Sequence, residues 1–142
     1  MTDIFSLPIV IDTNVVFEGL TKQGSASDLI VTAWLAGLLN VYASNALIYE
    51  YESTLSNKLS PTRWRQAKPI LRRMLNHVQF VSIYYSWRPL SPDPGDEHVI
   101  DCALNTNATV ITANVSDFRK AQTEVGLSVL SPVEFVNLLT KK

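Results

Sequence analysis

The sequence of 142 residues predicts an α/β fold, in which a mostly parallel sheet is covered by helices on both faces as a three-layer sandwich. Short apolar runs rich in Ile and Val alternate with segments of helical periodicity along the whole chain. Such β-branched runs are typical of strands buried on both faces. The chain contains no internal repeat, low-complexity tract or linker, so one domain over residues 1–142 is expected.

The strands are expected where apolar residues run together, at 9–11, 41–43, 78–83, 109–112 and 127–130. Between the runs, capping residues indicate where helices begin. Ser25 and Asp28 have the spacing of a capping box, and Asn45 precedes the apolar residues of the next helix. A third helix is expected to begin at Ser60–Pro61, because proline suits the first turn. Pro69 is expected to kink or divide that helix.

Two later helices follow a proline-rich loop at residues 88–95, RPLSPDPG. The first is expected to begin at Asp96 and end near Leu104. At about 100° per residue, Asp96 shares a side with the apolar residues, so it is expected to lean toward the sheet. Asp101 is expected to point toward solvent or a neighbouring helix. The last helix begins at Ser131, which has capping-box spacing to Glu134.

The composition bounds the class of protein. No apolar run approaches the roughly 20 residues that cross a bilayer, so no membrane association is expected. The start MTDIFSLP lacks the basic and apolar regions of a signal peptide. Cys102 is the only cysteine, so no intrachain disulfide can form, which agrees with a cytoplasmic protein. A glycine-rich phosphate loop and a zinc-binding pattern are both absent, and His77 and His98 are the only histidines.

The basic residues are unevenly distributed, although the net charge is only −1. No acid occurs between Glu52 and Asp93, whereas that interval holds seven of the twelve basic residues. Such a segment is either a phosphate-binding surface or a solvated helix face. The candidates for contacts with nucleic acid are Arg63, Arg65, Lys68, Arg72 and Arg73.

Three acids are candidates for one site. Asp12 follows the run PIVI, and Asp117 follows TVIT after a short loop. Ligands bind beyond the carboxyl ends of strands in open parallel sheets, and Asp96 leans toward this sheet. Converging carboxylates repel one another, and Mg²⁺ or Mn²⁺, which prefer oxygen ligands, would offset that repulsion. Taken singly, each acid is more typical of a turn or a helix cap than of a ligand, and only their joint placement favours a site.

Four segments in order, IDTN, SNALIYEYESTL, DPGDEHVIDCAL and ATVITANVSDF, resemble the PIN-domain family from about Ile9 to Phe135. The most similar branch is that of the VapC-like toxin components of toxin–antitoxin systems. The resemblance implies a PIN-like three-layer sandwich and a ribonuclease that depends on Mg²⁺ or Mn²⁺. The catalytic acids that it implies are Asp12, Glu50, Asp96 and Asp117, and the implied metal ligands are Asp12, Asp96 and Asp117.

The choice between Glu50 and Glu52 rests on the family pattern, because helical periodicity places Glu52 nearer the apolar stripe. The residues expected to support the site are Thr13, Asn14, Asp101 and Asn114. Many PIN domains carry Asp where this chain has Asn114. An amide keeps an oxygen ligand but lacks the charge, which Asp117 would then supply.

The implied reaction is hydrolysis of a phosphodiester bond in RNA that leaves a 5′ phosphate. The basic interval 58–73 would steer the RNA, and Trp64 or Tyr51 would stack on an unpaired base. The family also implies an antitoxin protein as partner and a homodimer. Two alternatives stay open: a PIN-type module that binds nucleic acid without catalysis, and a haloacid-dehalogenase-like phosphatase. The phosphatase pattern requires a second Asp two positions after the first, where this chain has Asn14.

Overall fold

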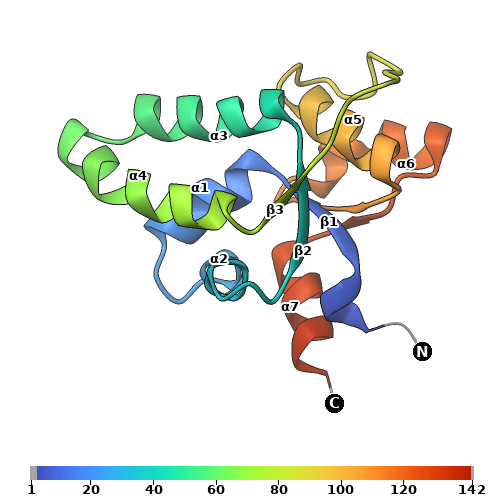
Figure 1. The fold of residues 1–142 in the computed structure, drawn as a ribbon. Helices are drawn as coiled ribbons and strands as arrows, with labels where there is room; N and C mark the ends of the chain where they lie inside the picture. The colour runs from blue at the N-terminus through green and yellow to red at the C-terminus, as the bar shows by residue number, and fades with distance from the viewer. Residues whose placement is uncertain (1–2, 142) are drawn as a thin grey trace.

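The computed structural model describes residues 3–141 and confirms the predicted α/β fold (Figure 1). Met1, Thr2 and Lys142, at the ends of the predicted domain, lie outside the described residues. Within residues 3–141, five parallel strands form one sheet in the order β3-β2-β1-β4-β5. The strands are β1 (Pro8–Ile11), β2 (Asn40–Ala43), β3 (Val78–Phe80), β4 (Thr109–Ile111) and β5 (Val129–Leu130).

Helices cover both faces of the sheet (Figure 1). One face carries α1 (Thr13–Thr21), α2 (Ala26–Leu35), α3 (Asn45–Lys58) and α4 (Pro61–Leu75), with α7 (Pro132–Thr140) packed against α2. The other face carries α5 (Asp96–Thr106) and α6 (Arg119–Val125). Two short 3₁₀ helices are η1 (Ile4–Ser6) and η2 (Val115–Phe118).

The strand order creates a topological switch point between β1 and β4. From β1 the chain builds outward to β2 and β3, and then returns to the other side of β1 to form β4 and β5. The connections therefore leave β1 and β4 in opposite directions, which opens a crevice at their carboxyl ends. Asp12 and Thr112 directly follow these two strands.

Tyr51 of α3 ties this helix to the end of β1. Its ring is fully buried and packs edge-on against Trp34, with the ring centroids 6.3 Å apart. Its hydroxyl donates to the carbonyl oxygen of Ile11. The prediction that Tyr51 stacks on a base is therefore wrong, because no face of the ring is exposed. Trp64 is partly buried against the core.

Some predicted helix features are confirmed and others are wrong. Ser131 and Glu134 form the complete predicted capping box. Helix α3 is capped by Ser44 instead of Asn45, since the Ser44 side chain accepts from the Leu47 amide. Helix α4 begins as predicted at Pro61, but it continues through Pro69 as one helix. Among residues 3–141, no helix combines the length and the apolar character needed to cross a membrane.

Three strands are shorter than the apolar runs that predicted them, whereas β1 and β2 each begin one residue earlier than expected. Strand β3 ends at Phe80 although the run continues to residue 83, β4 ends at Ile111, and β5 begins only at Val129. The amide of Val81 still donates to the Ala43 carbonyl oxygen at 3.0 Å, and the residues that follow extend toward α5. A run of apolar residues thus indicated the position of each strand but did not fix both of its bounds.

Candidate active site

Asp12 lies at the switch point, buried, with 4% of its surface exposed. It caps helix α1, and its Oδ1 accepts from the Thr13 amide at 2.8 Å. Its Oδ2 accepts from the Thr112 hydroxyl at 2.8 Å and from the Asn14 side-chain amide at 3.1 Å. Burial raises the pKa of Asp12 above its ordinary value, although the bonds from Thr112 and Thr13 act to lower it.

The loop after β4 supports Asp12 from the other side of the crevice. The Thr112 hydroxyl, which donates to Asp12, also accepts from the Asn114 amide at 3.0 Å. Asp117 lies half-buried on η2, and its amide donates to the Asn114 carbonyl oxygen at 3.0 Å. The negative charge of Asp117 contributes to the raised pKa of Asp12, so the two carboxylates are electrostatically coupled. The Asn114 side chain is exposed.

Asp96 begins helix α5 and is held by the loop that precedes it. The Ser91 hydroxyl donates to Asp96 Oδ2 at 2.9 Å and accepts from the Asp93 amide at 3.2 Å. Burial, followed by the charge of Asp12, raises the pKa of Asp96 to about 7. The charge of Asp93, which was not among the predicted site residues, also contributes to that shift. The acid-rich segment DPGDE was the only feature of the sequence that indicated a role for Asp93.

Glu50 approaches the same place from helix α3. Burial, then the charges of Asp12, Asp93 and Asp96, raise the pKa of Glu50 to about 7. Its Oε2 is buried without a hydrogen-bond partner among the described residues. A Cβ at Gly95 would lie only 2.7 Å from Glu50 Oε1, so glycine permits this close approach of α3 and α5. Glu52 is exposed, which is the opposite of what helical periodicity suggested.

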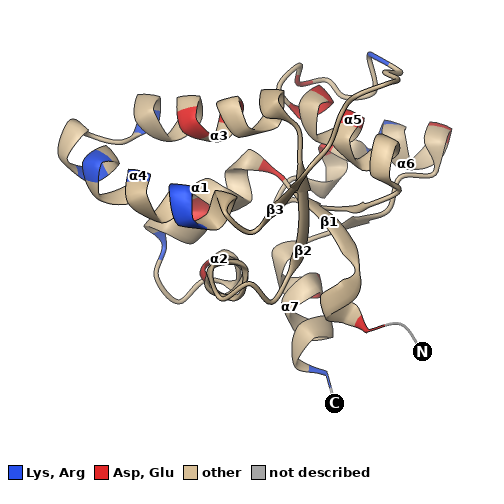
Figure 2. Ribbon diagram, viewed as in Figure 1, with Lys and Arg blue, Asp and Glu red and all other residues tan. Residues whose placement is uncertain are grey.

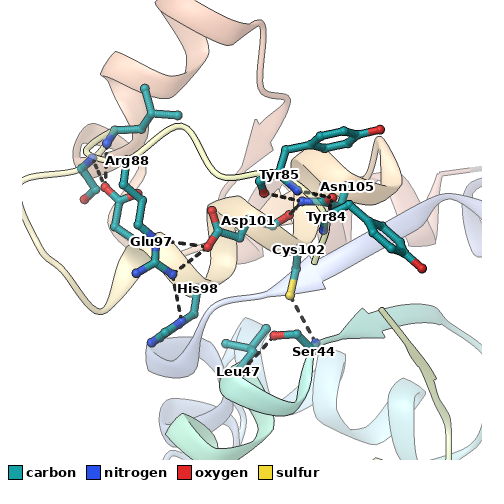
Figure 3. A network of polar contacts seen from close by, with 12 residues as sticks. Ser44, Leu47, Tyr84, Tyr85, Arg88, Glu97, His98, Asp101, Cys102 and Asn105 are labelled. Carbon is teal, nitrogen blue, oxygen red and sulfur yellow. Dashed lines mark hydrogen bonds and ion pairs between the residues drawn. The ribbon is translucent and has the colours of Figure 1, made fainter. Parts of the chain in front are cut away.

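Asp101 lies apart from these acids. It is buried, and its Oδ2 accepts from Arg88 Nη2 at 2.6 Å and Nε at 3.1 Å (Figure 3). The prediction that Asp101 points toward solvent or a neighbouring helix is therefore wrong, because the loop that carries Arg88 covers it.

Residues 84–91, which we term the strap, lie along one face of α5. The strap is held by side chains one turn apart on this helix: Glu97, Asp101 and Asn105 (Figure 3). Glu97 Oε1 accepts from the amides of Leu90 and Ser91, at 2.6 and 2.9 Å. Asn105 Oδ1 accepts from the Tyr84 and Tyr85 amides, at 3.0 and 3.2 Å. The strap thus presents Ser91 to Asp96 from a fixed position.

The five predicted nucleic-acid-binding residues all lie exposed on helix α4. Within residues 3–141, none of these five side chains forms an ion pair. Figure 2 shows basic residues gathered on α4 and acidic residues on α3 and at the start of α5. The predicted nucleic-acid-binding residues therefore lie on a different helix from the predicted catalytic acids Glu50 and Asp96.

A divalent cation such as Mg²⁺ needs several oxygen ligands around one position. Among residues 3–141, no three Asp, Glu, His or Cys side chains are arranged to hold one ion as they stand. The coupled side chains nevertheless present only carboxylate oxygens, which Mg²⁺ and Mn²⁺ prefer. The unpartnered Oε2 of Glu50 is suited to a ligand of this kind. The chemistry of Asp12, Glu50, Asp96 and Asp117 therefore fits a divalent cation.

Comparison with family models gives a match over residues 8–116, to the model described as a PIN domain. This chain belongs to the PIN-domain family. PIN domains are generally nucleases, and PIN nucleases typically use divalent metals. The matched region of this PIN domain contains Asp12, Glu50, Asp96 and Asn114, and it ends one residue before Asp117. Comparison with curated protein sequences gives no match.

Solved structures with a similar fold include complexes from three bacteria. VapBC2 from Rickettsia felis, bound to a DNA fragment from its promoter, is 14% identical with a TM-score of 0.64, covering 88% of this chain and 98% of that chain. FitAcB from Neisseria gonorrhoeae is 19% identical with a TM-score of 0.59, covering 88% and 98%. VapBC-1 from nontypeable Haemophilus influenzae is 16% identical with a TM-score of 0.58, covering 89% and 99%. The PIN domain described above therefore shares their fold.

Proposed function

We propose that this PIN domain is a divalent-metal-dependent endoribonuclease and the toxin of a toxin–antitoxin pair. One observation supports it most directly. Carboxyl groups from four separate segments, after β1, on α3, at the start of α5 and on η2, lie near one another at the switch point, where the charges of Asp12, Asp96 and Asp117 add to the raised pKa of neighbouring acids. Burying like charges together is unfavourable without a cation to neutralise them, and a phosphodiester supplies the matching oxygen ligands.

The chain's own residues have distinct roles in this proposal. Asp12, Asp96 and Asp117 hold the metal, which when bound neutralises charge on the phosphoryl oxygens and makes water more acidic. Glu50, with its pKa of about 7, accepts a proton from the attacking water. Asn14 and Thr13 fix the orientation of Asp12 through the two bonds described above. Asn114 supports Asp12 through Thr112.

The partners of this chain are part of the same proposal. VapBC2, FitAcB and VapBC-1 are toxin–antitoxin complexes, which supports an antitoxin protein as the partner of this PIN domain. We also propose that the chain forms a homodimer and that RNA is its substrate. The phosphatase alternative has no support from the family match, and the side-chain amide of Asn14 donates to Asp12 where that family has an acid.

The test is cleavage of a mixed pool of single-stranded and structured RNA with Mn²⁺. Wild type and Asp12→Asn are purified identically and compared, with EDTA as a further control. We expect cleavage by wild type alone and its loss in EDTA, because Asp12 is central to the acids. Equal cleavage by both proteins would show a contaminant or a wrong site.

A second candidate is a PIN-type module that binds nucleic acid without cutting it. Asn114 favours it, because an amide stands where many PIN domains have a carboxylate. In that case RNA binding persists unchanged when metal is chelated, and no cleavage occurs with any metal. Asn114→Asp then becomes the informative variant, since a restored acid would be expected to restore cleavage.

A further inference from the structure

A cavity of about 290 Å³ lies between α3 and α5, beside the acids. Glu50 and Gly95 line this cavity, and Glu50 is also coupled to Asp12 and Asp96. A group bound in the cavity is therefore the immediate neighbour of whatever is bound at the acids. The volume is just below that of most small-molecule sites, which span about 300–1,000 Å³, so it suits one ring system better than a long ligand.

The walls of the cavity supply flat surfaces. Tyr49 of α3 contributes an aromatic ring, and 72% of this residue is exposed. His98 of α5 and Pro94 of the preceding loop contribute two more rings. Because Tyr49 lies outside the hydrophobic core, its ring is available to pack on a ligand without disturbing the fold.

Arg88 fixes the hydrogen-bonding character of His98. Its Nη2 lies 3.3 Å from His98 Nδ1, and the same nitrogen is bound to Asp101 (Figure 3). A guanidinium group can only donate, so His98 Nδ1 accepts. The neutral ring then carries its proton on Nε2. His98 therefore offers a donor from this nitrogen.

Resting on the nuclease function proposed above, we propose that this cavity binds one nucleobase next to the scissile phosphate of single-stranded RNA. The base stacks on Tyr49, and an acceptor on its edge receives the hydrogen bond from His98. A base fits this place because the cavity shares Glu50 with the acids that would meet the phosphate. Every base has a π-face for stacking and at least one acceptor on its edge.

The proposal is tested with Tyr49→Ala, Tyr49→Phe and His98→Ala. The matched control is Tyr84→Ala, an 81% exposed tyrosine on the strap that does not line the cavity. Binding of short random-sequence single-stranded RNA is measured by fluorescence anisotropy, with Asp12→Asn added to every protein to prevent cleavage. The base frequencies next to the cut are measured separately, by sequencing products of the proteins that retain Asp12.

We expect Tyr49→Ala to weaken binding roughly 10-fold, because stacking on an aromatic ring generally contributes that much, whereas Tyr49→Phe keeps near-wild-type binding. In cleavage, Tyr49→Ala raises KM more than it lowers kcat, and His98→Ala alters the base preference at one position beside the cut. Thermal melting confirms that each variant is folded.

The outcomes separate this inference from the nuclease proposal. If Tyr49→Ala and His98→Ala match Tyr84→Ala in both binding and base preference while wild type cleaves RNA, the cavity is not a base site. If wild type binds RNA without cutting it, the nuclease proposal fails, and the binding comparison still decides the cavity. If wild type neither binds nor cuts the random RNA, both are overturned.

Discussion

The carboxyl groups at the switch point are individually unremarkable in sequence and unusual in structure. Asp12 is buried and receives three hydrogen bonds, whereas Glu50 leaves one buried oxygen without a partner. Burial is the largest cause that raises the pKa of Asp12, Glu50 and Asp96. The charge of Asp12 adds to the pKa shifts of Glu50 and Asp96, and the charges of Asp93 and Asp117 add to that of Asp12. A nearby negative charge stabilises the protonated form of a carboxyl group and destabilises its charged form.

This coupling predicts how stability depends on pH in the absence of metal. Glu50 and Asp96 have pKa values of about 7 in the folded protein, against ordinary values of 4.5 and 3.8. Between these limits the folded state binds more protons than the unfolded state, so stability is lost as pH rises through about 7. We expect the urea midpoint in EDTA to fall between about pH 5 and pH 8. The fall should be shallower in Glu50→Gln, and an unchanged slope in that variant would contradict the assignment.

The sequence predicted most of these acids, but not all of their partners. Asp12 was predictable because an unpaired carboxylate at the end of a buried apolar strand is costly to remove from water. Glu50 came from the family pattern, since helical periodicity favoured Glu52, and the structure leaves Glu52 exposed. Thr112 and Asp93 were missed. Their importance depends on contacts with residues that the fold brings near, such as the bond between Thr112 and Asp12, 100 positions apart.

The strap connects the outer face of α5 to the acids. It has no strand or helix of its own, and side chains of α5 replace the backbone partners that a sheet would supply. Of the three α5 side chains that hold the strap, Glu97 is the one connected to the acids, because it accepts from the amide of Ser91, whose hydroxyl donates to Asp96. The position of the Asp96 side chain is therefore set partly by the side chain of Glu97, which acts through Ser91.

Replacing Glu97 tests this connection. Glu97→Ala leaves the Leu90 and Ser91 amides without their acceptor, and Leu90 is buried, so we expect a loss of about 1–3 kcal/mol in the free energy of unfolding. Cleavage should fall as well. Glu97→Gln retains a carbonyl oxygen and should restore most of both. The control is Glu124→Ala on α6, an exposed glutamate for which about 0.5 kcal/mol or less is expected.

Urea unfolding gives these values, and two results would count against the role of Glu97. Equal losses in Glu97→Ala and Glu97→Gln would show that the acceptor oxygen is not what matters. A Glu97→Ala protein as stable as the Glu124→Ala control would show that the strap is held by other contacts.

Capping serines made α4 and α7 predictable, whereas α1 and α6 were not predicted. Ser60 and Ser131 each cap the helix expected after them. Helix α1 was not predicted, because its cap is Asp12 itself and because β-branched residues such as Val15 and Val16 favour strands. Both valines are fully buried, so packing overrides their preference. Helix α6 has no side-chain cap and continues directly from η2.

The molecule as a whole separates its charges. The acids meet where β1 and β4 end, as the rule for parallel sheets predicts, but alternation of strands and helices could not give the strand order that places these two side by side. The basic residues lie instead along α4. A substrate that uses both surfaces must extend across α3, which packs against α4 and α5. A polymer satisfies this condition more readily than a small phosphate ester.

The salt dependence of RNA binding decides whether α4 takes part. Lys68 and Arg72 are exposed one turn apart on α4, and for single strands each phosphate contact contributes about 0.7 to the slope of log K against log salt concentration. In an Asp12→Asn background, the double variant Lys68→Ala with Arg72→Ala should therefore reduce the magnitude of that slope by about 1.4. It should also weaken binding equally for all RNA sequences. Lys141→Ala, an exposed lysine beyond α7, should leave the slope unchanged. An unchanged slope in the double variant would mean that α4 presents only a solvated basic face, and the RNA would then have to be held by the acids and their adjoining cavity alone.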